Sequence, residues 1–341
     1  LFGLTYKEIE KEFKIDKKIE ILLSSDSSVG VSKAMGLANI SFSEVFQELE
    51  PDILVVLGDR FEIFSAVSTA MILRIPVAHL SGGELTEGTI DDSIRHSITK
   101  MSHLHFVATQ EYKNRVIQLG ENPNRVYNFG EAGLDNIINL DLLSKGDFEK
   151  SIDFVLDKQS LLITYHPTTL DKIEKVKKDF KNILEVLDDL ENTSLIFTKA
   201  NSDEGGRLIN NMIDDYIKTR SKKAIAFTSL GQLRYLSALQ YVDAVFGNTS
   251  SGIVEAPSFQ IGTINIGTRQ KGRVQASSVI NSTNEKQSIK NAISQLYSDA
   301  FINQLKSVVN PYGKGNSSYN TKEVLKNIDL DNIIKKSFWD I

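Results

Sequence analysis

Residues 81–96, SGGELTEGTIDDSIRH, carry a high density of groups that could transfer protons. Four carboxylates, an arginine and a histidine follow a Gly-Gly turn, directly after IPVAHL (75–80), which is typical of a buried strand. A solvated loop before a helix would explain this stretch, and so would an active site. Glu84, fixed by the glycines at the strand end, is a stronger catalytic candidate than Glu87.

Asp59 ends another strand-like run, DILVVLG (52–58), and could approach Glu84. Carboxylates that face each other in a dry site push their pKa values apart, which supplies one base and one acid near neutral pH. A helix over residues 91–101 would place Asp92 and Arg95 away from its apolar face. Because Asp91 or Asp92 would also suit the start of a helix, one of the pair has a structural alternative.

Polar groups also follow apolar runs elsewhere in the chain. In open α/β sheets, ligands bind beyond the carboxyl ends of the strands. Each such residue alone is also explained as a helix cap, but their recurrence at five strand ends favours a site. The candidates at strand ends are Asp59, Arg60, Glu84, His166, Asn201, Asp203, Asn248, Thr249 and Ser250.

The turn GNTSSGIVEAP (247–257) is typical of an anion site. A strand leads into small hydroxyls and free backbone N–H groups at the start of a helix, which favour phosphate. Glu255 could hold a ribose diol, and Arg269 adds a guanidinium that donates two hydrogen bonds at once. We therefore expect a nucleotide diphosphate site that needs neither a metal nor a cofactor.

The composition indicates a globular protein of 341 residues, 41% hydrophobic and 24% charged, with a net charge of −5 and no cysteine. Such a chain lacks the basic footprint of nucleic-acid binding, a disulfide framework and an apolar run long enough to span a membrane. His103 and His105 form an H-x-H without a third metal ligand, so we interpret them, like His79, as structural. We expect a cytoplasmic location.

Short apolar runs alternate with helix-period segments, and the runs are continuous rather than alternating. This pattern predicts α/β architecture with parallel sheets covered on both faces. We expect two Rossmann-like domains, residues 1–150 and 151–320, and a helical C-terminal segment, 321–341. The expected strands are 19–23, 52–58, 77–80, 105–108, 126–130, 161–166, 194–200, 224–228, 244–248 and 263–267.

Together these stretches resemble the hydrolysing UDP-N-acetylglucosamine 2-epimerases of the sialic acid pathway. The resemblance covers almost the whole chain, in the family's order. The matching segments are LGDRFEIFSA, SGGELTEGTIDDSIRHSITKMSHLH, YHPTT, FTKANSDEGGR, GNTSSGIVEAP and INIGTRQKGR.

The resemblance implies a glycosyltransferase-B-like fold with the active site in the interdomain cleft. It implies conversion of UDP-N-acetylglucosamine and water to UDP and N-acetylmannosamine, through elimination to a 2-acetamidoglucal and then hydration. The catalytic acids fall on Asp59, Glu84, Asp91 and Asp92. The UDP contacts fall on Arg60, His166, Asn201, the Ser229–Leu230 backbone, Thr249, Ser250, Glu255 and Arg269. We also include Arg95 and Asp203 among the substrate-binding candidates.

The sequence departs from the family pattern in two places. The family begins with a strand and a Gly-Thr-Arg-type loop; this chain starts after that unit, so we expect it to be part of a longer protein. Ala200 stands where the family often has proline. The resulting K-A-N resembles members that act on a bacillosamine-type sugar, 2,4-diacetamido-2,4,6-trideoxyglucose.

Four other functions remain open. They are the UDP-bacillosamine-type hydrolysing epimerase of the legionaminic acid route, the non-hydrolysing epimerase, a retaining glycosyltransferase and a non-enzymatic nucleotide-sugar sensor. For the main interpretation we expect a UDP-sugar as ligand, no nucleic-acid or membrane partner, and a homo-oligomer, either a dimer or a tetramer. The sequence does not decide the substituents at C4 and C6 of the sugar.

Overall fold

The computed structural model describes residues 6–10, 12–21, 28–86, 90–167, 172–200, 205–220 and 222–341. The chain divides into two compact units. Unit 1 comprises Leu1–Phe129 and Ser318–Ile341, and unit 2 comprises Gly130–Ser317. The division falls before the expected residue 150, and the C-terminal segment belongs to the first unit.

The position of the boundary follows from where the apolar residues after Gly130 pack. Phe148 and Ile152, on helix α7 (Lys145–Ile152), are buried in a core cluster of unit 2. The hydroxyl of Tyr241 donates to the backbone oxygen of Leu143 at 2.7 Å. Residues 130–150, which the expected division placed in the first domain, are therefore an integral part of unit 2.

Each unit contains a parallel β-sheet, so the predicted α/β class with two parallel sheets is confirmed. Within the described residues, the orders are β1-β2-β3-β4 in unit 1 and β10-β9-β8-β5-β6-β7 in unit 2. The strands are β1 Leu54–Leu57, β2 Val77–Leu80, β3 Leu104–Val107, β4 Val126–Asn128, β5 Gln159–Thr164, β6 Thr193–Thr198, β7 Ala224–Phe227, β8 Ala244–Gly247, β9 Gly262–Ile266 and β10 Val279–Ser282.

Two differences from the expected strands stand out. Strand β10 was not expected, because VINS lacks a long apolar run. Residues 19–21 of the expected strand 19–23 are not in a strand, and residues 22–23 lie outside the described residues.

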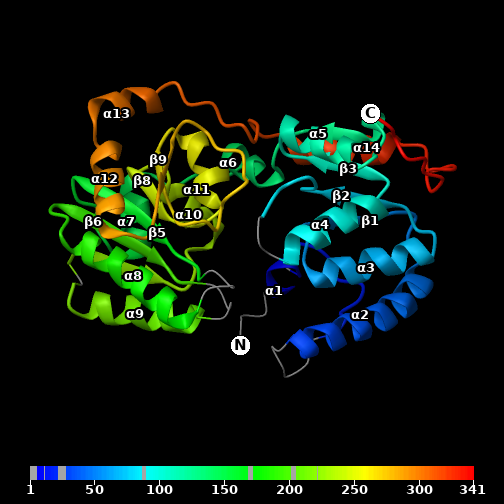
Figure 1. Cartoon of the computed structure of the whole chain (residues 1–341), viewed down its shortest axis with the longest axis horizontal. Coiled ribbons are helices and arrows are strands. Elements are labelled where there is room, and N and C mark those ends of the chain that lie inside the picture. Colours follow the sequence, from blue (N-terminus) through cyan, green and yellow to red (C-terminus); the bar gives the residue numbers. More distant parts are fainter. Residues whose placement is uncertain are drawn as a thin grey trace. The chain divides into compact units, whose positions relative to one another are not determined.

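The described helices include those that connect most successive strands, as a doubly wound arrangement requires (Figure 1). They are α1 Tyr6–Ile9, α2 Ser28–Leu49, α3 Phe61–Ile72, α4 Ile90–Met101, α5 Gln110–Gln118, α6 Asp135–Asn139, α7 Lys145–Ile152, α8 Ile173–Asp188, α9 Gly206–Lys218, α10 Gly231–Ala238, α11 Ser251–Val254, α12 Lys286–Leu296, α13 Asp299–Leu305 and α14 Ser317–Asn327. No described helix is long and apolar enough to cross a membrane.

The sheet of unit 2 is covered by apolar side chains on both faces. Successive side chains of a strand point to opposite faces: on β5, Leu161 and Ile163 join one core cluster, and Leu162 joins the other. Residues of α8, α9 and α12 complete the first cluster, and residues of α7 and α10 complete the second. This double cover explains the continuous apolar runs of the sequence.

Unit 1 is built in the same way but is covered less completely. One cluster joins α2, α3 and α4 to β1 and β2, and another joins β2 and β3 to Ile333 beyond α14. On β1, however, Val55 and Leu57 are 46% and 59% exposed. Ile72 at the end of α3 is 74% exposed, and Ile90 on α4 is also exposed.

Three histidines of unit 1 are fully or almost fully buried and bonded within the sheet region. The Nε2 atom of His79 lies 3.0 Å from the Gly58 oxygen, and the Nδ1 atom of His103 accepts from the Val77 N–H at 3.1 Å. Burial lowers the pKa of His79 to about 3, and burial together with the charge of Lys336 lowers that of His103 to about 4. These two histidines are therefore neutral in the folded protein at neutral pH.

This burial predicts that acid destabilises unit 1. Below a pH of about 6.5 the unfolded chain protonates His103, whereas the folded chain does so only near pH 4, so the free energy of unfolding falls across this window. We expect His103→Asn, which keeps an acceptor for Val77 but does not titrate, to lose less stability between these limits. Urea unfolding at a series of pH values measures both slopes, and equal slopes would contradict the prediction.

Candidate active site

A buried guanidinium joins the predicted acids of unit 1. Arg95 lies on α4, and its side chain is 3% exposed. Its Nη2 atom donates to the carboxylate of Asp59 and, at 2.9 Å, to the hydroxyl of Thr86. Its Nη1 atom donates to the backbone oxygen of Glu84 at 2.9 Å and lies 3.5 Å from Oδ1 of Asp92. One side chain thus contacts the carboxylates of Asp59 and Asp92 and the backbone of Glu84.

The turn that leads to Glu84 depends on glycine. Gly83 has a φ of +78°, and a Cβ atom there would lie 2.5 Å from the backbone oxygen of Tyr112. Arg115, also on α5, donates to the backbone oxygen of Gly83. Helix α5 therefore supports the backbone of this turn. Glu84, which follows the turn, is 6% exposed.

The structure distinguishes the two adjacent aspartates at the start of α4. Oδ1 of Asp92 accepts from the Thr86 N–H at 2.8 Å and lies near Arg95, whereas Asp91 is exposed. Asp92 therefore belongs to the group around Arg95. The hydrogen bond from the Thr86 N–H also gives Asp92 a structural role.

His96 is a member of this group that we did not include among the candidates. Its Nε2 atom lies 3.7 Å from Oδ2 of Asp92, and its buried Nδ1 atom has no hydrogen-bond partner within the described part of the chain. Burial lowers the pKa of His96, although Asp92 opposes the shift. The signal in the sequence was the i,i+4 spacing from Asp92, which places the two side chains on one side of a helix.

Arg60 lies apart from the Arg95 contacts. Its side chain is 70% exposed at the N-cap of α3, and its Nε atom lies 3.2 Å from the carboxylate of Glu62. This position leaves its guanidinium accessible to a ligand. The contact of Arg60 with UDP stays a prediction.

In unit 2 an asparagine fixes the ends of two adjacent strands. Thr164 of β5 pairs with Gly247 of β8. The side chain of Asn248 then accepts from the His166 N–H at 2.7 Å and donates to the His166 oxygen at 2.8 Å. Asn248 is 1% exposed. It holds the backbone of His166 as another strand would.

The same asparagine receives the loop after β9. Its backbone oxygen accepts from the side-chain amide of Gln270 at 2.8 Å, and Nη1 of Arg269 lies 3.4 Å away. Gln270 is 3% exposed, whereas Arg269 is half-buried. Asn248 was among the candidates at strand ends, whereas Gln270 is a functional candidate that we did not choose, although it lies within a quoted motif. Its signal was its position beside Arg269.

The expected anion turn has a shorter helix than its sequence suggested. Thr249 is half-buried and Ser250 is exposed, and helix α11 that follows has only four residues before a 3-10 helix, Ala256–Phe259. A phosphate here would depend on N–H groups and hydroxyls more than on a helix dipole, which needs several turns to build up. Burial raises the pKa of Glu255, which follows this helix.

The remaining candidates of unit 2 lie at two other strand ends. Ser229 is exposed after β7, and its hydroxyl accepts from the Gly231 N–H at 3.0 Å. Leu230 is buried at the N-cap of α10. Asn201 and Asp203 lie outside the described residues.

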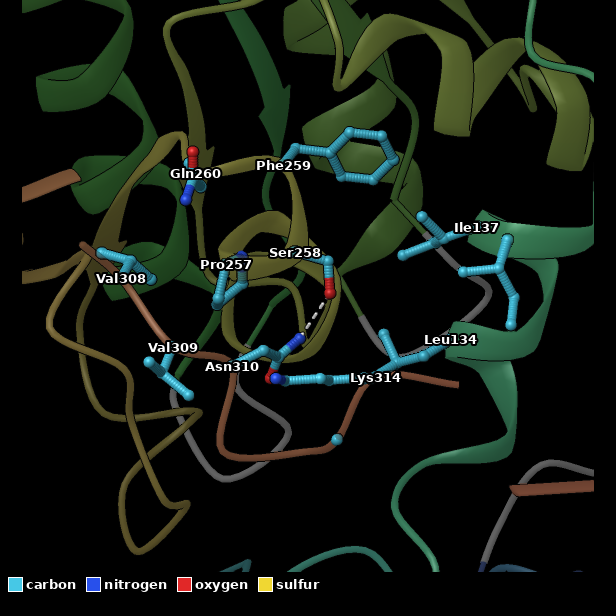
Figure 2. A pocket seen from close by; sticks show the side chains of 12 residues that line it. Leu134, Ile137, Pro257, Ser258, Phe259, Gln260, Val308, Val309, Asn310 and Lys314 are labelled. Carbon is cyan, nitrogen blue, oxygen red and sulfur yellow. Dashed lines mark hydrogen bonds between the residues drawn. The ribbon is translucent and has the colours of Figure 1, made fainter. Parts of the chain in front are cut away.

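A cavity of about 390 Å³ in unit 2 lies elsewhere (Figure 2). None of the predicted site residues lines it. Its lining is largely apolar, and the amide of Asn310, which points into it, is already bonded to the hydroxyl of Ser258 at 2.7 Å. No group of three or more His, Asp or Glu side chains that could hold a metal ion occurs in the described ranges.

Comparison with known proteins shows similarity to one family over almost the whole chain. The family model "UDP-N-acetylglucosamine 2-epimerase" matches residues 2–326. The chain is 50% identical to "GDP/UDP-N,N'-diacetylbacillosamine 2-epimerase (hydrolyzing)" from Campylobacter jejuni, over 100% of this chain and 88% of that protein. It is 37% identical to a polysialic acid biosynthesis protein from Escherichia coli, over 100% of this chain and 87% of that protein.

The fold is found in a solved structure of lower sequence similarity. The UDP-GlcNAc 2-epimerase from Neisseria meningitidis, crystallised with UDP-GlcNAc, superposes with a TM-score of 0.79 at 20% identity, over 93% of this chain and 86% of that one. The fold is thus of the two-domain, glycosyltransferase-B-like class. With a family match over nearly its whole length and a half-identical hydrolysing relative, the chain belongs to the UDP-N-acetylglucosamine 2-epimerase family, in its hydrolysing branch.

Proposed function

We propose that the protein hydrolyses UDP-linked 2,4-diacetamido-2,4,6-trideoxyglucose, the diacetylbacillosamine sugar, with inversion at C2. The observation that carries this proposal is the 50% identity over the full chain to a hydrolysing diacetylbacillosamine 2-epimerase. The K-A-N stretch of residues 199–201, expected from the sequence to mark this branch, agrees with it. The products are UDP and the free 2,4-diacetamido-2,4,6-trideoxymannose.

The acids of unit 1 supply the proton transfers. In the first step a carboxylate takes the C2 proton, the C2–H electrons form the C1–C2 double bond, and the C1–O bond breaks to release UDP. In the second step water adds its oxygen to C1, and a proton returns to the opposite face of C2. Glu84 and Asp59 are our candidates for the two proton-transferring groups, each worth ~10²–10⁴ in rate.

Arg95 is proposed to orient these acids rather than to bind UDP. Its guanidinium is already engaged by Asp59, Thr86 and the Glu84 backbone. Removing it would leave buried acceptors and a carboxylate without their partner, at a cost of ~3–5 kcal/mol for a buried pair. The departing UDP is assigned to the strand ends of unit 2, where Arg269, Thr249 and the neighbouring N–H groups can stabilise its charge.

A second substrate is favoured by a separate observation. The family model that matches residues 2–326 is named for UDP-N-acetylglucosamine, which supports that sugar nucleotide as substrate, with N-acetylmannosamine as product. The two sugars differ at C4 and C6 and undergo the same reaction at C1 and C2. The choice between them therefore depends on groups around C4 and C6.

A panel of sugar nucleotides tests the substrate. We expect kcat/KM for the UDP-linked diacetylbacillosamine sugar to exceed that for UDP-N-acetylglucosamine by at least ~10²-fold, because unpaired polar groups around a wrong C4 substituent are costly. The GDP-linked sugar belongs in the panel, since the name of the Campylobacter relative includes both nucleotides. A higher kcat/KM for UDP-N-acetylglucosamine would contradict the proposed substrate and indicate a role in the sialic acid route.

Isotope labels test the elimination. In H₂¹⁸O we expect the label at C1 of the free sugar and none in UDP, because water adds to C1 after the C1–O bond has broken. In D₂O the sugar should carry one deuterium at C2 with manno configuration. Mass spectrometry and NMR of both products decide; ¹⁸O in a phosphate with an unlabelled C2 would exclude an epimerase.

We call Asp59, Glu84 and Asp92, which surround Arg95, the acid site. A single substitution tests it. We expect Glu84→Gln to lower kcat at least ~10²-fold, because the amide cannot exchange the proton, while UDP affinity measured by calorimetry stays nearly unchanged. Glu44→Gln, an exposed residue of α2, is the matched control and should retain full turnover. Equal activity of the two variants would remove Glu84 from the mechanism.

A further inference from the structure

The segment after α14 returns to unit 1 and packs on it. We call residues 328–341 the tail. Ile333 is 2% exposed in a core cluster, and its backbone oxygen accepts from Arg125 at 2.9 Å. Farther along, the ring of Phe338 covers Gly120 so closely that a Cβ atom there would lie 2.4 Å from it. The Trp339 N–H donates to the Gly120 oxygen at 2.9 Å.

Lys336 makes the most extensive polar contact of the tail. Its ammonium donates to the backbone oxygens of Lys100 at 2.9 Å and Ser102 at 2.5 Å. It also lies 2.7 Å from the carboxylate of Glu121, which is 3% exposed. A lysine ammonium has three donors, so these three acceptors match its full capacity.

Two of these acceptors lie at the C-terminal end of α4. The last carbonyls of a helix have no partners within the helix, and a cation is favourable there. Burial lowers the pKa of Lys336, and the hydrogen bond and charge of Glu121 oppose this. Lys336 therefore caps α4 from a position more than two hundred residues away in the sequence.

The two helices that the tail fixes are those that hold the acid site. Helix α4 carries Asp92 and Arg95. Gly120, covered by Phe338, lies two residues beyond α5, which supports the turn before Glu84 through Arg115. A displacement of the end of either helix would therefore also displace the acidic residues, because a helix moves as a rigid element.

We propose that Lys336 is a positioning residue for the acid site, acting through the end of α4. This proposal rests on the proposed function, because it assumes that the acids perform the reaction. The family model ends at residue 326, so the tail lies beyond the part of the chain that the family match describes. Arg95 fixes the acidic residues relative to one another, and Lys336 fixes the helix that carries Arg95.

The test is Lys336→Met, which keeps the length of the side chain and removes its charge. We expect kcat to fall ~10- to 100-fold, since small displacements of reacting groups have effects of this size, with KM changing much less. Amide exchange should become faster in residues 90–101 and remain unchanged in unit 2. Lys335→Met is the matched control, because Lys335 is exposed and donates to Asn332 within the tail.

The outcomes separate this proposal from the proposed function. If kcat and exchange of Lys336→Met equal those of Lys335→Met, Lys336 does not position α4. If the wild type converts no sugar nucleotide, the proposed function fails, and exchange alone then decides whether Lys336 fixes the helix. If Lys336→Met does not fold, Lys336→Gln, which keeps a polar group that can donate, replaces it: faster exchange in residues 90–101 with reduced kcat supports the proposal, whereas no change overturns it.

Discussion

The buried guanidinium of Arg95 is the interaction on which the acid site depends. Several acidic residues close together repel one another, and burying them without a cation would be strongly unfavourable. Arg95 solves this with planar donors that reach two carboxylates, a hydroxyl and a backbone oxygen at once. The Gly83 turn, α5 and the tail all serve to keep this one side chain and its acceptors in place.

Unit 2 solves a different problem, the positioning of loops at the ends of parallel strands. Backbone groups at a strand end lose the partners that a sheet provides, and they must find others if they are buried. Asn248 supplies both a donor and an acceptor to His166 and offers its own backbone oxygen to Gln270. A neutral amide thereby fixes three segments without placing a charge beside the expected phosphates.

The fold class and most strands could be predicted because double-covered parallel strands leave continuous apolar runs in the sequence. Strand β10 and the residues 130–150 could not be assigned, since VINS is short and a polar stretch does not reveal which core its few apolar residues join. For the site, motifs indicated the acidic candidates and the turn of residues 247–257 as a candidate anion site. The buried position of Arg95 and the contacts of Asn248 and Lys336 depend on tertiary neighbours, which spacing along the chain does not reveal.

Unit 1 is discontinuous, because Ser318–Ile341 completes a structure that begins before Phe129. A ribosome makes all of unit 2 between these two parts, and domains tend to fold as they emerge. Unit 2 can therefore be folded while the sheet of unit 1 still lacks Ile333 and the cap on α4. Of the two units, the one that carries the acids is therefore the later to be completed during synthesis.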